Sequence, residues 1–221
     1  MRLKKGLLMP KLIPDAEFSK KFSGLERNHD DLNHFLSKGV EDYYVEGISL
    51  PEGYRLVKSR QNATHTNGGE LIRIRLIYSN EGVQETIYAV NLVLLNDLLV
   101  SNRHCTQIMV WRSPYERYEE VLFRFAKKMF LHFIQEYIVI ASDSEQTSAG
   151  RRFWQVRIIE ALSRGENVYF LDCNDLDDNK VAILHRIESE AVFNDVWFDH
   201  GWGDDEEYKD RLFLISRDVL E

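Results

Sequence analysis

The polar segment Ser142–Thr147 stands between an apolar run and a helix-like pattern, within ASDSEQTSAGRRFW at 141–154. It brings together hydroxyl, carboxyl and amide groups, which are the groups that bind ligands and move protons. Ser, Asp and Thr also cap helices and form turns, because their short side chains accept hydrogen bonds from nearby backbone N–H groups. The segment therefore predicts either a ligand site at a strand end or a helix cap.

A second candidate region is the tract VFNDVWFDHGWGDDEEYKD, residues 192–210, in which aromatic residues alternate with clustered acids. Aromatic anchors inside a polar rim are typical of protein interfaces. The acids could also imitate the spacing of DNA phosphates, and a helix packed back on the domain is a further interpretation. The candidate partner-binding residues are Phe193, Trp197, Phe198, Trp202, Asp204, Asp205, Glu206 and Glu207.

The histidines and cysteines favour no metal or disulfide site. Seven histidines and two cysteines are present, without an H-E-x-x-H motif or zinc-ligand spacing. Two cysteines are too few for a disulfide framework, so we expect a reduced, cytoplasmic protein with no metal. The basic and apolar start of the chain is interrupted by Pro10, Lys11 and Pro14, and no run reaches the ~18 apolar residues of a membrane span.

Composition and charge predict one globular domain, residues 1–221. The chain is 44% hydrophobic and carries a net charge of -8. Residues 172–221 hold 15 Asp and Glu against 5 Lys and Arg, a local charge of -10, so the rest of the chain sums to +2. This balance disfavours broad nucleic-acid binding, which needs a basic face. It is compatible with a protein partner that presents a basic surface.

The first half of the chain predicts a helix followed by an antiparallel meander. Asn28 or Asp30 could cap a helix that ends near Gly39. Strand-like runs follow at 53–59, 71–79 and 85–95, and Asn80 and Gly82 mark a hairpin turn between the last two. The run 71–79 alternates apolar with basic residues, so its Leu71/Arg73/Arg75 face is expected to be wet.

The second half predicts a β-α-β-α-β unit. A strand at 106–112 leads into SPYE, which has the spacing of a capping box with Ser113 as N-cap. We expect one continuous helix from there to Phe133. A strand at 137–142, a helix at 148–163 and a strand at 167–172 follow, so the strands at 106 and 137 should pair in parallel. The tract 173–208 reads as an acidic insertion with a helix near 188–196, and 211–217 as the last strand. The predicted fold class is α/β with a mixed sheet.

This order of elements resembles the GNAT (Gcn5-related N-acetyltransferase) superfamily, in particular divergent members from bacteria and phages. The stretches FSGLERNHDDLNHFLSKGVEDY and SDSEQTSAGRRFW are similar to segments of such proteins. The resemblance implies acetyl-CoA as cofactor, with its pyrophosphate on a Gly-rich turn after the fourth strand. Here that turn reads WRSPYERYEEV, without glycine. Pro114 lacks an N–H group, and glutamates in the first turns repel phosphate.

The resemblance also assigns roles to single residues. Arg112, Ser113 and Arg117 would contact the cofactor if the altered turn still binds it. The tyrosine that serves as general acid in the family is replaced by Phe153, so Tyr169 is the candidate substitute. Asp143 would be a general base at the mouth where the parallel strands splay. The remaining candidates are Ser142 and Thr147 for catalysis, and Ser144, Gln146, Arg151 and Arg152 for ligand binding.

Three functions remain open on the sequence. The loss of two enzymatic features favours a GNAT-like protein that acts by binding a protein partner, as a regulator or inhibitor. An acyl or group transferase would instead keep a cleft around Asp143. An acidic nucleic-acid mimic would depend on the carboxylates at 204–207.

Overall fold

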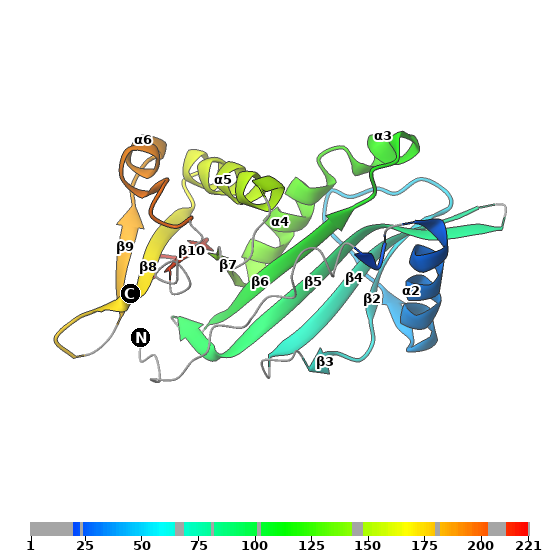
Figure 1. Ribbon diagram of the computed structural model, residues 1–221, viewed down its shortest axis with the longest axis horizontal. Helices are drawn as coiled ribbons and strands as arrows, with labels where there is room; N and C mark the ends of the chain where they lie inside the picture. The colour runs from blue at the N-terminus through cyan, green and yellow to red at the C-terminus, as the bar shows by residue number, and fades with distance from the viewer. Residues whose placement is uncertain are drawn as a thin grey trace. The chain divides into compact units, whose positions relative to one another are not determined.

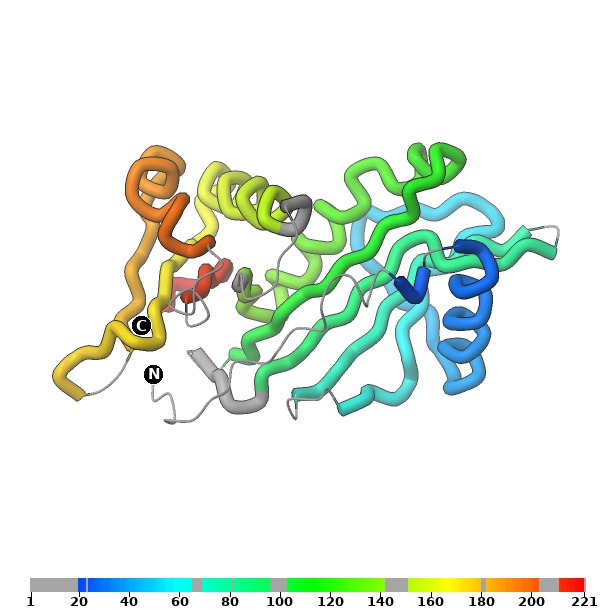
Figure 2. Tube along the Cα trace, viewed as in Figure 1, coloured from blue at the N-terminus to red at the C-terminus, as the bar shows by residue number. Residues whose placement is uncertain are grey.

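The computed structural model has an α/β fold built on a mixed, mostly antiparallel ten-stranded sheet, as the sequence predicts (Figure 1). It describes residues 20–22, 24–64, 69–80, 82–100, 103–142, 148–179, 182–202 and 211–220, and the rest is grey in Figure 2. Its strands are β1 (Val40–Asp42), β2 (Tyr54–Ser59), β3 (Ala63–Thr64), β4 (Glu70–Asn80), β5 (Val83–Val100), β6 (Arg103–Arg112), β7 (Ile138–Ser142), β8 (Asn167–Leu176), β9 (Ala182–Ile187) and β10 (Arg211–Ser216).

The helix predicted at 148–163 is present with these bounds, whereas the helices predicted after β6 and near 188–196 are divided into shorter segments. The helices are α2 (Leu25–Ser37), the 3-10 turn η1 (Glu116–Tyr118), α3 (Glu119–Leu122), α4 (Phe125–Glu136), α5 (Ser148–Ser163), α6 (Glu190–Val192) and the π-helical turn η2 (Phe193–Trp197). No helix in the described ranges is long and apolar enough to cross a membrane.

The strands follow the order β1-β2-β4-β5-β6-β7-β10-β8-β9, with β3 beside β4. β6 and β7 pair in parallel, with Cys105 opposite Ile138, which confirms the predicted parallel pairing. β10 is antiparallel to both β7 and β8. The last strand therefore lies between two strands that precede it in the sequence.

Contacts along the chain define two compact units. The first, which we call the meander unit, comprises residues 15–94 and 108–133. The second unit comprises residues 1–14, 95–107 and 134–221.

In the meander unit, two helices cover opposite faces of the antiparallel strands. Leu32 and Phe35 of α2 pack on Val57 and Ile77. On the other face, Phe125 of α4 meets the ring of Tyr88 edge-on, with 4.9 Å between ring centroids. The antiparallel pairing of β2 with β4 and of β4 with β5 confirms the predicted meander.

The start of the first helix differs from the prediction. The helix begins at Leu25, and its N-cap is Gly24, whose φ of 90° favours glycine. Asn28 lies inside the helix, and its side chain is used elsewhere. Its Nδ2 donates to Thr86 O over 2.8 Å, and Thr86 N donates to its Oδ1 over 2.7 Å. Asn28 therefore ties the helix to β5 instead of capping it.

The predicted continuous helix after β6 is also wrong, because the chain breaks at Phe123 and Arg124. Arg124 has a φ of 55°, a left-handed conformation that is uncommon for a residue other than glycine. The apolar stripe predicted for this helix is nevertheless buried throughout, because the broken segments still turn the same side inward. Its members are Tyr118, Leu122, Phe125, Met129 and Phe133.

The face of β4 that was expected to be wet is covered at Arg75. This residue is only 3% exposed, and its guanidinium carbon lies 5.2 Å from the Phe22 ring centroid and 5.3 Å from that of Phe35. Its Nη1 donates to Asn91 Oδ1 over 3.2 Å and to backbone carbonyls. The alternation predicts the strand correctly, but it does not reveal that two phenylalanines cover the face.

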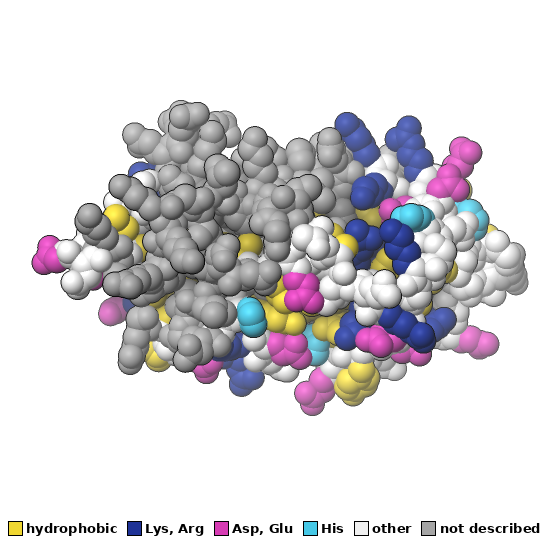
Figure 3. Space-filling model, turned by 90° about the horizontal axis from the view of Figure 1, so that it is seen from below, with side chains coloured by type: hydrophobic (Ala, Val, Ile, Leu, Met, Phe, Trp, Pro, Cys, Tyr) yellow, Lys and Arg dark blue, Asp and Glu magenta, His cyan; other side chains and the backbone are white. Residues whose placement is uncertain are grey.

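Exposed charges on the meander unit form pairs across strands. Arg55 meets Asp42 at 2.7 Å, and Lys58 meets Glu41 at 3.0 Å. Figure 3 shows Lys and Arg side chains, with Asp and Glu among them, on the described part of one face of the molecule. Exposed pairs of this kind contribute ~0–1 kcal/mol each, so they set the surface character more than the stability.

The second unit is organised around Phe213 of β10. Its ring contacts Phe170, Phe193 and Trp202 at centroid distances of 5.5, 5.6 and 5.3 Å. A Cβ on Gly201 would lie 2.1 Å from this ring, so a larger residue would have to displace a buried side chain. The predicted helix near 188–196 is present as α6 and η2, and β9 is an unpredicted strand within the acidic tract.

Candidate functional site

The turn after β6 is held by the chain's own polar groups. A register shift in the β4/β5 pairing leaves Ile87 without a Cα partner on β4, and Ile87 O accepts from Ser113 N over 2.9 Å. Tyr115 N in turn donates to Ser113 Oγ over 3.4 Å. Pro114 has no N–H group. Three successive residues of this turn thus offer no free backbone donor to a ligand.

The capping box predicted here is not formed. The helical turn begins at Glu116, with Tyr115 as N-cap and no side-chain cap. Ser113 lies two residues before that cap, so its hydroxyl stabilises the turn instead of the helix end. The Ser113 hydroxyl does accept a hydrogen bond from a backbone N–H group, as a capping residue would. The donor is Tyr115 N, which lies before the helical turn.

A cavity of about 340 Å³ opens at this turn. Its walls carry the positive Arg112, the carboxylates of Glu116 and Glu119, and the half-exposed ring of Tyr115. An excess of carboxylates beside an aromatic ring favours a cationic group over a phosphate. The full lining is Arg112, Ser113, Pro114, Tyr115, Glu116 and Glu119.

Next along the chain, Arg117 and Tyr118 bind a buried carboxylate that the sequence did not single out. Glu85 of β5 is 2% exposed, and its Oε1 accepts from Tyr118 Oη and from Arg117 Nη2, the latter at 2.5 Å. Glu85 Oε2 is buried and has no hydrogen-bond partner among the described residues. Arg117 was predicted to contact a cofactor, and here it neutralises this carboxylate.

Strand register places tyrosines around Glu85. Tyr78 of β4 pairs with Glu85, and Tyr54 of β2 pairs with Tyr78. The rings of Tyr54, Tyr78 and Tyr118 form a cluster, with centroids 5.0 to 6.5 Å apart. The turn at Asn80 and Gly82 was recognised in the sequence, and pairing outward from it is the signal that would have found Tyr78 and Glu85.

The polar segment Ser142–Thr147 lies mostly outside the described residues. Asp143, Ser144, Gln146 and Thr147 are not described, so their predicted roles stay predictions. Ser142 ends β7, opposite Leu212 of β10.

The two arginines that follow the segment lie on α5. Arg151 pairs with Asp199 at 3.4 Å and lies over the Phe198 ring at 5.8 Å. Arg152 is exposed. The arginine beside the candidate ligand segment is therefore joined to the aromatic acidic tract.

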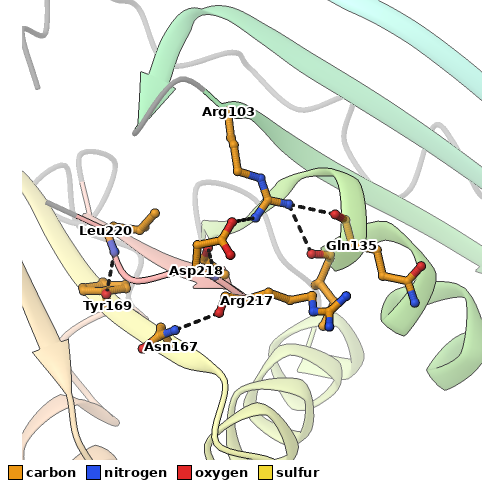
Figure 4. A network of polar contacts seen from close by, with 9 residues as sticks. Arg103, Gln135, Asn167, Tyr169, Arg217, Asp218 and Leu220 are labelled. Atoms are coloured by element: carbon orange, nitrogen blue, oxygen red, sulfur yellow. Dashed lines mark hydrogen bonds and ion pairs between the residues drawn. The ribbon is translucent and has the colours of Figure 1, made fainter.

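Tyr169, the candidate substitute for the general acid, is buried in a network of the second unit (Figure 4). Its hydroxyl accepts from Leu220 N over 2.9 Å. Nearby, Arg103 donates to Asp218 over 2.5 Å and to Gln135 O over 3.1 Å. These contacts give Tyr169 a structural partner.

The aromatic residues of the acidic tract divide into two groups. Phe193 and Trp202 are buried against Phe213, so they are core residues of the second unit in this conformation. Trp197 and Phe198 are half-buried, and Trp197 stacks on Phe170 with 4.6 Å between centroids. Of the four aromatic partner anchors that the sequence predicts, these two retain exposed surface. Asp204, Asp205, Glu206 and Glu207 lie outside the described residues.

Histidines of the second unit contact acids and rings. His185 Nε2 lies 2.7 Å from Asp175 Oδ2, and the His185 ring is 5.4 Å from that of Trp197. Asp199 pairs with Arg151 as described above. Among the described residues, no group of three or more His, Cys, Asp and Glu is placed to hold a metal ion.

The chain was compared with protein-family models, with curated proteins and with solved structures, and none of the three comparisons finds a significant match.

Proposed function

We propose that this chain is a GNAT-like protein that binds a protein partner with a basic surface and acts as a regulator or inhibitor, without using acetyl-CoA. The proposal joins the altered turn after β6 to the acidic character of the chain. The net charge of -8 and the carboxylates that line the cavity favour a cationic partner.

The state of the backbone at residues 113–115 is the observation that carries this proposal. A diphosphate binds a turn of this kind through free N–H groups that point at its oxygens. Here Ser113 N and Tyr115 N are already bonded, and residue 114 is proline. Glu116 and Glu119 then face the same cavity and repel a phosphate.

Topology supports the GNAT-like part of the proposal. An antiparallel meander leads into β6, which pairs in parallel with β7 after a helical crossover through α3 and α4. This is the order of elements on which the resemblance rests. The breaks in the crossover helix and the added strand β9 are departures from it.

Calorimetric titration with acetyl-CoA and with CoA tests the function. We expect no heat of binding and no thermal shift at ligand concentrations up to about 1 mM, which corresponds to a binding free energy weaker than about -4 kcal/mol. Binding at micromolar strength would contradict the proposal. A protein that is known to bind CoA, titrated in the same buffer, is the control for the ligand solutions.

A divergent group transferase is the second candidate, and the positive charge of Arg112 in the cavity wall is the feature that favours it. In that case Arg112 would hold one phosphate group, and the Arg112→Ala variant would lose CoA binding. The same titrations decide between the two candidates, because only the transferase requires CoA to bind.

A further inference from the structure

The buried carboxylate of Glu85 is only half used. Glu85 Oε1 receives two donors, from Tyr118 and Arg117, whereas Oε2 has none among the described residues. A buried carboxylate oxygen without a donor is costly, because it has lost water and gained no hydrogen bond. A planar guanidinium can donate to both oxygens of a carboxylate at once, and this is the geometry that the second oxygen lacks.

The surroundings of Glu85 suit a planar cation. Tyr118 presents its ring 4.8 Å from the Arg117 guanidinium, and the rings of Tyr54 and Tyr78 complete the cluster. Aromatic faces attract guanidinium groups through their negative quadrupole and allow them to stack. The combination of one buried carboxylate with several tyrosine rings is the chemistry that recognises an arginine side chain.

Arg117 occupies this position loosely. Its side chain is 53% exposed although its partner is buried, and a single hydrogen bond at 2.5 Å joins it to Glu85. It comes from the three-residue turn η1, and its other ring contact is the half-exposed Tyr115, at 5.0 Å. An exposed cation held by one hydrogen bond can leave, but the buried Glu85 then requires another cation in its place.

We propose that Glu85, Tyr54, Tyr78 and Tyr118 form a guanidinium-binding site, which Arg117 fills in this structure and which an arginine side chain of the protein partner takes over. The partner's arginine donates to both oxygens of Glu85, and Arg117 is displaced into solvent. The identity of the incoming group as a partner's arginine rests on the proposed function, whereas the site itself does not.

The Arg117→Ala variant tests the site directly, because it removes the internal occupant and leaves a space of guanidinium size. Thermal unfolding is measured with 0 to ~20 mM guanidinium chloride at constant ionic strength, far below the concentrations that denature proteins. We expect the midpoint of the variant to rise by about 3–5 °C at ten times the dissociation constant. The wild type should respond much less, because its own Arg117 competes at a high effective concentration.

Three controls give the test its specificity. The unfolding midpoint of the Glu85→Gln/Arg117→Ala double variant should not rise in guanidinium chloride. The midpoint of Arg117→Ala should not rise when ammonium chloride replaces guanidinium chloride. A blocked Gly-Arg-Gly peptide should stabilise Arg117→Ala, and Gly-Lys-Gly should not, because lysine lacks the planar fork. If Arg117→Ala does not fold, Arg117→Gln retains the aliphatic stem and is measured in the same way.

The site is excluded if the Arg117 variants respond to guanidinium no more than the wild type, or if the double variant responds equally. If guanidinium binds but the arginine peptide does not stabilise the variant, the site does not accept an arginine side chain and the proposal fails. None of these measurements uses CoA. A positive CoA titration would therefore overturn the proposed function and leave the guanidinium site standing.

Discussion

Arg75 of β4 and Glu85 of β5 are both buried charged residues, and the protein stabilises the two charges in different ways. Burial lowers the pKa of Arg75 to about 10, and the nearby Asp31 counteracts this shift in part, so Arg75 is still charged at neutral pH. Two phenylalanine rings and backbone carbonyls hold it. Glu85 depends instead on a tyrosine hydroxyl and on the exposed Arg117. Because Arg117 is exposed, its contact with Glu85 is easier to replace than the contacts of Arg75.

The hydrogen bond from Tyr118 to Glu85 gives an alkaline pH dependence. Burial, followed by this hydrogen bond, raises the pKa of Tyr118 above its ordinary value of 10. The unfolded state therefore loses this proton first, so the stabilisation is complete below pH 10 and is lost as the pH rises toward the folded pKa. We expect the free energy of unfolding of the wild type to exceed that of Tyr118→Phe by about 1–3 kcal/mol at pH 8. This difference should shrink above pH 10.

Urea denaturation of both proteins between pH 8 and pH 11 measures this difference. The comparison cancels contributions that both proteins share, such as that of Arg75. Tyr115→Phe is the matched control, since Tyr115 is a half-exposed tyrosine of the same turn. A constant difference across this pH range would show that the Tyr118 proton is not linked to folding.

At the scale of elements, α2 is attached to the sheet by packing, by a buried contact of Asn28 and by an exposed contact of His29 Nδ1 with Gln84 O at 3.2 Å. Leu32 and Phe35 supply the apolar face, and Asn28 supplies a double hydrogen bond to the backbone of Thr86. Thr86 lies next to Ile87, where the register of β4 and β5 shifts. An asparagine side chain has an NH₂ group that donates and a carbonyl oxygen that accepts, so it can satisfy both backbone groups of a residue at such an irregularity.

The Asn28→Ala variant should therefore lose more stability than its small volume change suggests. It leaves Thr86 N and Thr86 O buried without their partner, at a cost of about 2–4 kcal/mol. Asn33→Ala on the exposed side of the same helix is the control and should change stability by less than about 0.5 kcal/mol. Equal effects of the two substitutions in chemical denaturation would contradict this account.

At the scale of the whole molecule, periodicity predicts most of the sheet but not the details that build the site. The meander and the parallel β6/β7 pair follow from alternation and connection length. The strands β1 and β3 have two or three residues, too few for a period to be recognised. Glu85 resembles an ordinary strand residue until register places it beside Tyr78. In the sequence, Asn28 resembles a helix cap. Its actual partner, Thr86, is 58 positions away, so the local pattern does not reveal the contact.

Residues 217–220 show how contacts distant in sequence join the second unit. Leu220 N donates to Tyr169 Oη, Asn167 Nδ2 donates to Arg217 O over 3.1 Å, and Arg103 reaches Asp218. Leu220 is also buried. The segment thus connects β8 with Arg103 of β6, which in turn donates to the end of α4 (Figure 4).

Deletion of residues 218–221 should lower the free energy of unfolding by roughly 2–4 kcal/mol. Loss of the Leu220 side chain from the core accounts for about 2 kcal/mol, and loss of the hydrogen bond from Leu220 N to Tyr169 Oη adds about 1 kcal/mol. The half-exposed ion pair of Arg103 with Asp218 adds little, because solvent screens it. Chemical denaturation measures the loss, and Val219→Ser at an exposed position should be nearly neutral.

A double-mutant cycle separates the hydrogen bond from the apolar contact within this loss. Tyr169→Phe should cost about 1 kcal/mol in the full chain, because Leu220 N loses its acceptor. In the deleted chain the same substitution should cost almost nothing, since that donor is already gone. If Tyr169→Phe costs the same in both chains, the hydroxyl does not act through Leu220, and its role in the second unit must be assigned to another group.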